Sequence, residues 1–351
     1  MTKELMSHEI LLKERSFGIP RESDFEYVQT SVPGPKKDQF LVRNIWMSVD
    51  PYMRGRMRET KSYIPPFRLN MPLEGACVGQ VVETKNNKFN IGDYVLSNFG
   101  WREYWVTGED SAIIRIDPNM APPRSYLGIM GSTGLTAYIG LLKIAELKNS
   151  DEASTVFVSA AAGAVGSVAC QIAKIMGSRV IGSTGSQEKV NWLLEENIAD
   201  DAFNYKENEE SSITSKLREL CVDGIDTYFD NVGGKQLKQL EGAIENMKIF
   251  GKIILCGMIS QYNLTNPPLV PSNLFLAITK RLKLQGFIVR DHYQMLNEFQ
   301  NIMSNWIKQG KMKWKETIVD GLENAPSAFI GLFKGENIGK MIVKIGPDPS
   351  V

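Results

Sequence analysis

The stretch from Ser154 to Gly166, STVFVSAAAGAVG, constrains the fold most, because an apolar run ends in three alanines and is followed by Gly163 and Gly166. An apolar strand that stops at small residues and restarts as a helix brings backbone N–H groups to a helix N-terminus, where a pyrophosphate can bind. The usual first glycine is Ala161 here, so the pattern is A-x-G-x-x-G. The stretch predicts a dinucleotide-binding turn. Because so short a motif also matches unrelated chains, the surrounding sequence has to support it.

Beyond this turn, helical and extended patterns alternate along the chain. Residues 164–176 place apolar side chains on one helical face, Gly177 follows as a C-cap, and Ser186 can cap the next helix. Runs that are typical of strands occupy residues 154–159, 179–184, 201–205, 224–232, 251–258 and 282–289. The alternation predicts an α/β fold with a Rossmann-type, doubly wound parallel sheet. The alternative is a set of buried strands that bind no ligand.

The end of the second predicted strand distinguishes between the two nicotinamide dinucleotides. An NAD site places Asp or Glu there, about twenty residues past the glycines, to bind the ribose 2′-hydroxyl. In this chain the position is GSTGS, residues 182–186, with no carboxylate before Glu188 and with Lys189 in the next helix. Hydroxyl groups and a cation suit a 2′-phosphate, so the sequence favours NADP(H). The alternative is that Lys189 is simply an exposed helix lysine.

Composition and charge limit the partners of this chain. Its 351 residues are enough for two domains, and 43% hydrophobic with 23% charged residues is ordinary for a globular protein. The 40 Lys and Arg residues balance the 40 Asp and Glu residues, so we expect neither nucleic acid nor a membrane as a partner. The start of the chain lacks a signal-peptide core and no long apolar segment follows, which predicts a cytoplasmic enzyme.

The two ends of the chain differ from its middle. In the first 125 residues, short β-like runs separated by Pro, Gly and Asn turns include residues 40–49, 75–84 and 93–106. Near the C-terminus, residues 314–321 and 340–346 resemble strands on either side of a short helix at 324–335. We expect a β-rich domain built from both chain ends, with the dinucleotide domain inserted and a substrate cleft between them.

Six short runs, in order, resemble one protein family along nearly the whole chain. They are VDPYMRGRM (49–57), AAAGAVG (160–166), FNYK (203–206), FDNVGG (229–234), CGMISQYN (256–263) and GENIGKMIVK (335–344). Together they resemble the zinc-independent branch of the medium-chain dehydrogenase/reductase superfamily, which contains prostaglandin reductases (leukotriene hydroxydehydrogenases) and 2-alkenal and curcumin reductases. The resemblance implies a GroES-like substrate domain over residues 1–125, a Rossmann NADP-binding domain over 126–312, and a return of 313–351 to the substrate domain.

The residues that would bind zinc in a metal-dependent relative are missing from the matching runs. A catalytic zinc needs ligands such as Cys and His, and a structural zinc in such enzymes needs four clustered cysteines. The run MSVDPY has no cysteine, and Leu73 stands where a histidine would precede the Glu-Gly pair. We therefore expect no metal, and surface positions for His8 and His292. The four cysteines lie far apart in apolar patterns, which predicts buried free thiols.

Without a metal, a neutral donor has to stabilise the charge that forms during hydride transfer. Reduction of a C=C bond conjugated to a carbonyl places negative charge on the carbonyl oxygen, and a tyrosine hydroxyl can donate to it and pass on a proton. Tyr262 follows the predicted strand 251–258 at the carboxyl end of the sheet and is the first candidate. Tyr52 in VDPYMR, a tyrosine that faces the cleft in the resembling enzymes, is the second. The alternatives are that Tyr262 only shields the cofactor and that Tyr52 packs in the core.

Three arginines alternate in and just after the run that contains Tyr52. Arg54, Arg56 and Arg58 could attract an acidic substrate or the phosphates of a cofactor. Charges at alternating positions more often form a solvated face, so we predict no catalytic role for them.

The resemblance also implies which residues contact NADP(H). Carried over position by position, the pyrophosphate contacts are Ala162, Gly163, Ala164, Val165 and Gly166. The 2′-phosphate end corresponds to Lys189 and Tyr205, and Asn231 to the asparagine beside the ribose. The nicotinamide edge corresponds to Cys256, Gly257, Met258, Ile259, Ser260, Gln261, Tyr262, Phe287, Ile288 and Val289, with Asn337 reaching back from the C-terminal segment. Asn231 could instead only cap a turn, and Phe287 and Val289 could be ordinary buried strand residues.

The activity that these observations predict is NADPH-dependent reduction of the C=C bond of α,β-unsaturated ketones or aldehydes. Hydride would reach the β-carbon, and Tyr262 or water would supply a proton to the α-carbon. The alternatives are an NADPH quinone oxidoreductase and a non-catalytic NADPH-binding sensor. We expect a small-molecule enone, enal or quinone as the substrate, and the resembling proteins imply a homodimer.

Overall fold

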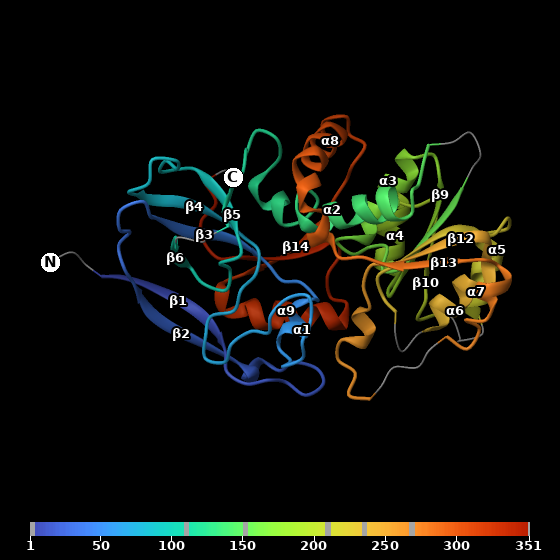
Figure 1. Ribbon diagram of the computed structural model, residues 1–351, viewed down its shortest axis with the longest axis horizontal. Helices are drawn as coiled ribbons and strands as arrows, with labels where there is room; N and C mark the ends of the chain where they lie inside the picture. Colours follow the sequence, from blue (N-terminus) through green and yellow to red (C-terminus); the bar gives the residue numbers. More distant parts are fainter. Residues whose placement is uncertain are drawn as a thin grey trace. The chain divides into compact units, whose positions relative to one another are not determined.

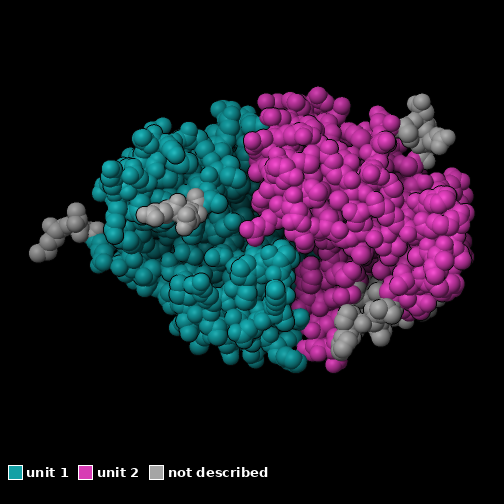
Figure 2. Space-filling model, viewed as in Figure 1, with its two compact units in different colours: residues 1–128, 316–337, 341–351 teal, residues 129–315, 338–340 magenta. Residues whose placement is uncertain are grey.

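The computed structural model describes residues 4–108, 112–149, 154–207, 212–233, 237–266 and 271–349. The chain divides into two compact units, coloured in Figure 2. Unit 1 consists of residues 1–128, 316–337 and 341–351, and unit 2 of residues 129–315 and 338–340. Within the described ranges, no helix is both long enough and apolar enough to cross a membrane.

Unit 2 contains a six-stranded parallel sheet in the order β10-β9-β8-β11-β12-β13. Figure 1 labels its strands β9, β10, β12 and β13. Its strands are β8 (Thr155–Val158), β9 (Arg179–Thr184), β10 (Asp201–Asn204), β11 (Ile225–Asp230), β12 (Met247–Leu255) and β13 (Lys283–Gly286). The chain runs outward from β8 to β10, then crosses back and continues from β11 to β13. The topological switch point therefore lies between β8 and β11, where an open α/β sheet binds its ligand. The predicted doubly wound parallel sheet is confirmed.

Helices cover both faces of this sheet. They are α2 (Ser132–Ile139), α3 (Gly166–Ile175), α4 (Gln187–Glu195), α5 (Ser212–Leu220), α6 (Leu237–Asn246), α7 (Leu276–Thr279) and α8 (Leu296–Lys308). Successive side chains of a strand point to opposite faces. Tyr228 of β11 accordingly packs with residues of α5 and α6, whereas Phe229 approaches Gly140 at the end of α2. Both faces are buried, which explains why the strands read as continuous apolar runs.

The structure differs from the predicted elements mainly at their boundaries. β12 begins at Met247 rather than at 251. The strand predicted over 282–289 ends at Gly286, because its partner β12 ends at Leu255, directly opposite. Phe287 to Val289 therefore lie beyond the sheet at its carboxyl edge and are half-buried rather than buried strand residues.

Unit 1 is rich in β-structure. A seven-stranded sheet runs in the order β14-β15-β3-β4-β5-β7, with β6 paired to β3, and β1 and β2 form a separate antiparallel pair. The elements are β1 (Leu5–Leu12), β2 (Phe25–Val32), β3 (Phe40–Ser48), α1 (Met53–Arg56), β4 (Cys77–Thr84), β5 (Tyr94–Ser97), β6 (Tyr104–Val106), β7 (Ile114–Arg115), β14 (Glu316–Asp320), α9 (Ala325–Lys334) and β15 (Lys340–Lys344). β15 pairs antiparallel with β3, so strands from both chain ends share one sheet.

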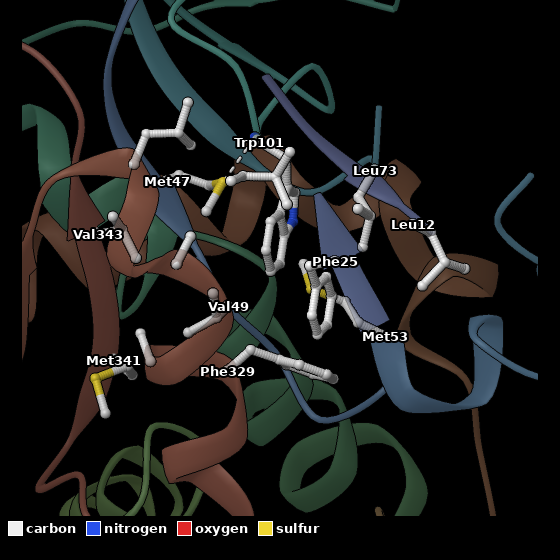
Figure 3. Packing of buried hydrophobic residues seen from close by; sticks show 14 of the residues in the cluster. Leu12, Phe25, Met47, Val49, Met53, Leu73, Trp101, Phe329, Met341 and Val343 are labelled. Atoms are coloured by element: carbon white, nitrogen blue, oxygen red, sulfur yellow. Dashed lines mark hydrogen bonds between the residues drawn. The ribbon is translucent and has the colours of Figure 1, made fainter. Parts of the chain in front are cut away.

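Trp101 lies at the centre of the core of unit 1. It is fully buried, stacks on Phe25 with ring centroids 5.9 Å apart, and meets the edge of Phe329 at 6.3 Å (Figure 3). Its backbone N–H donates to the sulfur of Met47 at 2.7 Å. The φ angle of Trp101 is +63°, in the left-handed region, which interrupts the extended chain. The β-like run 93–106 accordingly forms two strands, β5 and β6, instead of one.

The arginines of the VDPYMRGRM run are buried, which contradicts the expectation of a solvated face for Arg54 and Arg56. The guanidinium group of Arg54 donates to the carbonyl groups of Ser16 and Gly18 at 3.1 and 2.7 Å. Burial and, to a smaller extent, the nearby charge of Arg58 lower the pKa of Arg54 to about 10, while Asp24 acts in the opposite direction. Arg56 donates to Glu74 at 2.6 Å. These arginines connect backbone segments of unit 1, because long side chains can bury their stems wherever their charged ends find acceptors.

Candidate functional site

The turn between β8 and α3 is built from small residues because its backbone folds tightly on itself. Ala160 has a φ angle of +48°, and the N–H of Gly163 donates to its carbonyl at 2.9 Å. A Cβ atom on Gly163 would lie 3.1 Å from that carbonyl oxygen, and one on Gly166 would collide with it. Helix α3 begins at Gly166 directly after the turn, and the N–H of Ser167 in its first turn donates to the carbonyl of Gly163 at 3.0 Å. A tight turn of small residues at a helix N-terminus suits a pyrophosphate group, and the individual contacts stay predictions.

The chain near the C-terminus lies beside this turn. The N–H of Gly339 donates to the carbonyl of Ala162 at 2.8 Å, and Gly339 forms a parallel bridge with Gly163. The φ angle of Gly339 is +66°, and a side chain there would collide with the carbonyl of Lys315. Residues 338–340 thus belong to unit 2, whereas the preceding Asn337 is grouped with unit 1. The predicted cofactor contact of Asn337 stays a prediction.

At the other side of the β8 turn, strands β9 and β10 end together. Thr184 pairs with Asn204, and the N–H of Tyr205 donates to the carbonyl of Thr184 at 3.0 Å. This register brings Tyr205 and the residue after it next to Gly185. An ideal Cβ on Gly185 would lie 3.2 Å from the Tyr205 hydroxyl and from Cε of Lys206, and 3.5 Å from the Lys206 Nζ. A glycine here leaves space bordered by a phenol and an ammonium group.

Lys189 lies one turn into α4, close to the same place. Ser186 caps this helix as predicted, with its hydroxyl accepting the N–H of Lys189 at 3.4 Å. The pKa of Lys189 is lowered by burial first and then by the positive charge of Lys206, while Glu188 acts in the opposite direction. Two like charges close enough to interact, beside a phenol, form a cluster suited to a phosphate dianion. Sequence reasoning missed Lys206, although it directly follows Tyr205 in the FNYK run.

Asn231 follows β11 at the switch point of the sheet. Its backbone N–H donates to the hydroxyl of Ser159 at 2.9 Å, and its side-chain amide nitrogen donates to the carbonyl of Ser159 at 2.8 Å. These two bonds join the ends of β8 and β11 and turn the amide oxygen of Asn231 away from Ser159. The side chain of Asn231, which is predicted to contact the ribose, is therefore held in one orientation, and its amide oxygen can accept a hydrogen bond.

The predicted nicotinamide segment, residues 256–262, is hydrogen-bonded to the loop that follows β11. The N–H groups of Cys256 and Gly257 donate to the carbonyl of Asp230 at 2.9 and 3.1 Å. The N–H and hydroxyl of Ser260 donate to the carbonyl of Val232 at 3.2 and 2.7 Å. Residues 230–232 and 256–262 are thus joined by hydrogen bonds at the carboxyl edge of β11 and β12. Asp230 has a larger part in this hydrogen-bonded segment than the sequence indicated.

Tyr262 is held against the backbone of the same segment. The N–H of Met258 donates to the Tyr262 hydroxyl oxygen at 3.4 Å, and an ideal Cβ on Gly257 would lie 3.7 Å from that oxygen. Burial raises the pKa of Tyr262, the Met258 N–H acts in the opposite direction, and the charge of Cys256 raises it further. Tyr262 is therefore a phenol at neutral pH. Its oxygen accepts the backbone N–H, and a phenol can donate a hydrogen bond as well as accept one.

Comparisons with known proteins agree with this geometry. Residues 8–115 match the model of a family described as N-terminal domain of oxidoreductase, and residues 164–309 match one described as Zinc-binding dehydrogenase. The NADP(+)-dependent 2-alkenal reductase of Nicotiana tabacum is 41% identical, over 98% of this chain and 99% of its own. The NADPH-dependent curcumin reductase of Escherichia coli (strain K12) is 36% identical, over 96% of each chain. The chain belongs to the medium-chain dehydrogenase/reductase family.

The fold of this medium-chain reductase also matches a solved structure. The crystal structure of CurA from Vibrio vulnificus in complex with NADPH is 38% identical and superimposes with a TM-score of 0.88. It covers 97% of this chain and 100% of its own. The likeness therefore includes both units, the β-rich one and the one with the parallel sheet.

The family description mentions zinc, which raises the question of whether the side chains of this chain could hold that metal. In the part of the chain that the structure describes, no group of three or more His, Cys, Asp or Glu side chains could hold a metal. Burial raises the pKa of the Cys77 thiol to about 12, and Leu73 is buried in the core of unit 1. His8 and His292 are both part-exposed, and the ring of His8 lies 3.1 Å from Glu103 and stacks on Tyr27. The residues of this chain do not fit a zinc centre of the alcohol dehydrogenase type.

The remaining predicted residues of this medium-chain reductase lie in different parts of the chain. Tyr52 belongs to unit 1, where it precedes α1 and packs, half-buried, against the core around Trp101. Its catalytic role stays a prediction. Of the four cysteines, Cys77, Cys170 and Cys221 are buried free thiols as predicted, whereas Cys256 is half-buried at the end of β12.

Proposed function

We propose that this protein catalyses the NADPH-dependent reduction of the C=C bond of α,β-unsaturated ketones or aldehydes. The observation that carries the proposal is the phenol of Tyr262, held beside the backbone of residues 257–258 at the carboxyl edge of the sheet. This is the edge at which an open α/β sheet binds a dinucleotide. Similar proteins support the proposal, because the relatives that match nearly the whole chain are named as 2-alkenal and curcumin reductases.

NADP(H) is the cofactor that the site residues of unit 2 fit. The turn at Gly163 would hold the pyrophosphate, and Lys189 and Tyr205, together with Lys206, would hold the 2′-phosphate. Asn231 would accept a hydrogen bond from the ribose on the nicotinamide side, and the backbone at 256–258 would border the nicotinamide. When bound, the cofactor supplies the hydride.

Tyr262 has the properties that the chemical step requires. As the new C–H bond forms at the β-carbon of the substrate, the electrons of the C=C bond move toward the carbonyl, whose oxygen becomes negative. A hydrogen bond from the Tyr262 hydroxyl stabilises this oxygen, and a single donor of this kind typically contributes about 10²- to 10³-fold to the rate. The proton that completes the product reaches the α-carbon from Tyr262 or from water.

The two units would have different roles. We infer that unit 2 is the NADP-binding domain, and that unit 1, with strands from both chain ends, is the GroES-like substrate domain. Tyr52 of unit 1 would then contact the substrate. A Tyr52→Phe variant tests this inference, because a substrate contact predicts a higher KM for the enone with an unchanged Kd for NADPH.

A homodimer is part of the proposal, supported by the edge of the sheet in unit 2. Among the described strands, β13 has a neighbour on one side only, β12. Exposed apolar side chains occur next to it in the chain, at Phe275 and Ile278, and at Phe250, whose N–H bonds to the carbonyl of Lys280. Unpaired strand edges and exposed apolar patches are common sites of association. Light scattering coupled to size-exclusion chromatography would give twice the chain mass for a dimer and a single chain mass for a monomer.

One assay distinguishes the candidate activities. The purified protein is incubated with NADPH and, separately, an enone, an enal, a quinone and a saturated ketone, while the loss of nicotinamide absorbance is followed. Turnover of the enone and enal supports the proposal. Turnover of the quinone alone would replace it with quinone reduction, and NADPH binding without turnover of any acceptor would favour the sensor.

A further inference from the structure

Asp230, the last residue of β11, is fully buried at the switch point of the sheet. One of its carboxyl oxygens, Oδ1, accepts four hydrogen bonds. The donors are the hydroxyl groups of Ser159 and Tyr228, both at 2.9 Å, and the N–H groups of Val232 and Gly233 at 2.9 and 3.1 Å. The other oxygen, Oδ2, is buried and has no partner among the described residues.

The same residue also connects to the next strand through its backbone. Its carbonyl accepts the N–H groups of Cys256 and Gly257, which follow β12. Ser159, which donates to the Asp230 side chain, in turn accepts the N–H and the amide group of Asn231. One buried residue therefore fixes the ends of β8, β11 and β12 relative to each other.

Stability alone does not account for a carboxyl group at this place. Burying a carboxyl group is unfavourable unless its acceptors are used, and here one oxygen is saturated while the other is unpartnered. An apolar core residue would avoid that cost, as the neighbouring Phe229 does on the other face. What Asp230 provides is a defined geometry for the two loops that follow β11 and β12.

These two loops lie on one side of the switch point. The loops follow β11 and β12 and contain Asn231 and residues 256–262. On the other side of β8, at β9 and β10, lie Lys189, Tyr205 and Lys206. A dinucleotide that crosses the switch point has one half on each side. Asp230 bonds to the loops that follow β11 and β12 and to Ser159 at the end of β8, and to no described residue of β9 or β10.

We propose that Asp230 is a positioning residue for the nicotinamide half of the cofactor, acting through Asn231 and the backbone of Cys256 and Gly257. This inference rests on the proposed NADPH site. It does not require that the reaction be the reduction of a C=C bond, because its consequences can be measured by binding alone.

The test compares two ligands, NADPH and adenosine 2′,5′-bisphosphate, which contains the adenosine half with its 2′-phosphate and its 5′-phosphate but no nicotinamide half. Asp230→Ala removes all four side-chain acceptor bonds, and Asp230→Asn keeps a weaker acceptor in the same shape. We expect Asp230→Ala to raise the Kd for NADPH by about 30-fold and Asp230→Asn by about fivefold. The Kd for the bisphosphate should change by less than about twofold in both variants. Its 2′-phosphate would lie at β9 and β10 and its 5′-phosphate at the turn of residues 160–166, whereas the Asp230 side chain bonds to Ser159, Tyr228, Val232 and Gly233.

A second variant covers the case in which Asp230→Ala does not fold. Ser159→Ala leaves the carboxyl group in place but removes its link to the N–H of Asn231, and should weaken NADPH by about fivefold with bisphosphate binding kept. Asp226→Asn is the matched control. Asp226 lies on the same strand at its amino end, where its carboxylate accepts from Thr155 and Lys248, so neither Kd should change.

The outcomes separate the possibilities. A loss of NADPH affinity with bisphosphate binding kept supports the positioning role. Parallel losses for both ligands would mean a general structural role and would overturn the inference, as would unchanged binding of both in Asp230→Ala. Wild-type protein that binds NADPH but reduces no enone would contradict the proposed reaction. The comparison of the Kd values for NADPH and the bisphosphate would still test the role of Asp230. Wild-type protein that binds neither ligand would overturn both.

Discussion

The carboxyl edge of the sheet in unit 2 is built differently at its two ends. At β9 and β10, Gly185 leaves space beside Tyr205 and Lys206, and the side chains there are half-buried or exposed. At β11 and β12, the loops are tied together by hydrogen bonds that converge on the buried Asp230. The first end can select a ligand by charge. The second end holds its loops in one arrangement, which suits a place where a hydride must be transferred along a defined direction.

This difference predicts that substitutions at the two ends change different quantities. The β11–β12 end should control the rate of the chemical step, and the β9–β10 end should control the preference for NADPH over NADH. A substitution at one end that changed the quantity assigned to the other end would contradict this difference.

Tyr262→Phe should lower kcat for an enone by about 100-fold, because it removes the donor to the developing oxyanion. The Kd for NADPH should change little, since phenylalanine keeps the ring that packs beside residues 257–258. Stopped-flow measurement of nicotinamide oxidation, together with a fluorescence titration of NADPH, separates the two quantities. An unchanged kcat would assign Tyr262 the role of a shield for the cofactor.

Lys189→Ala should raise the Kd for NADPH by about 10- to 100-fold, the range expected for the loss of a charge-assisted hydrogen bond to the 2′-phosphate. The Kd for NADH, which has no such phosphate, should stay within about twofold. Calorimetric titration of both cofactors measures the ratio. Lys216→Ala is the control, because Lys216 pairs with Glu219 on α5. Equal weakening of NADPH and NADH would remove Lys189 from the 2′-phosphate site.

Lys206→Gln should weaken NADPH by about threefold to fivefold, less than Lys189→Ala, because Lys206 is the more exposed of the two. NADH binding should not change. Lys216→Gln serves as the matched control in the same titration. If NADPH binding is unaffected by Lys206→Gln, only Lys189 contributes a functional cation at this end.

The pH dependence of cofactor binding provides a smaller effect with a defined sign. The pKa of Lys189 is lowered by burial and by Lys206, and only the protonated amine attracts the 2′-phosphate. As the pH rises through this lowered pKa, affinity for NADPH should fall, earlier than for an ordinary lysine, while affinity for NADH stays constant. Lys206→Gln removes the neighbouring charge and should move the fall to higher pH. A fall at the same pH in both proteins would show that the two amines do not interact.

Local patterns in the sequence were sufficient for the sheet and for the turn that begins α3. The run 179–184 forms β9 with the predicted ends, Ser186 caps α4, and Gly177 ends α3 with a φ angle of +80°. Each of these depends on neighbours within a few residues. Strand periodicity and capping are short-range properties, and the sequence contains them in full.

The network around Asp230 could not be read from the sequence, because its members are far apart. Ser159, Asp230 and Cys256 are brought together only by the parallel pairing of β8, β11 and β12. The same holds for the burial of Arg54, whose acceptors are carbonyl groups at residues 16 and 18. Lys206 was overlooked because its relevance depends on the register between β9 and β10. The Asp230 network, the burial of Arg54 and the position of Lys206 all depend on contacts between distant parts of the chain rather than on local composition.

An isotope-tracing experiment tests the proposed reaction. The protein is incubated with a simple enone and NADPH that carries deuterium at both positions of C4 of the nicotinamide, and the product is analysed by NMR. The expected product is a saturated ketone with deuterium on its β-carbon. Deuterium on the carbonyl carbon of an allylic alcohol, or an enone recovered without deuterium while the cofactor stays reduced, would contradict the proposed reaction.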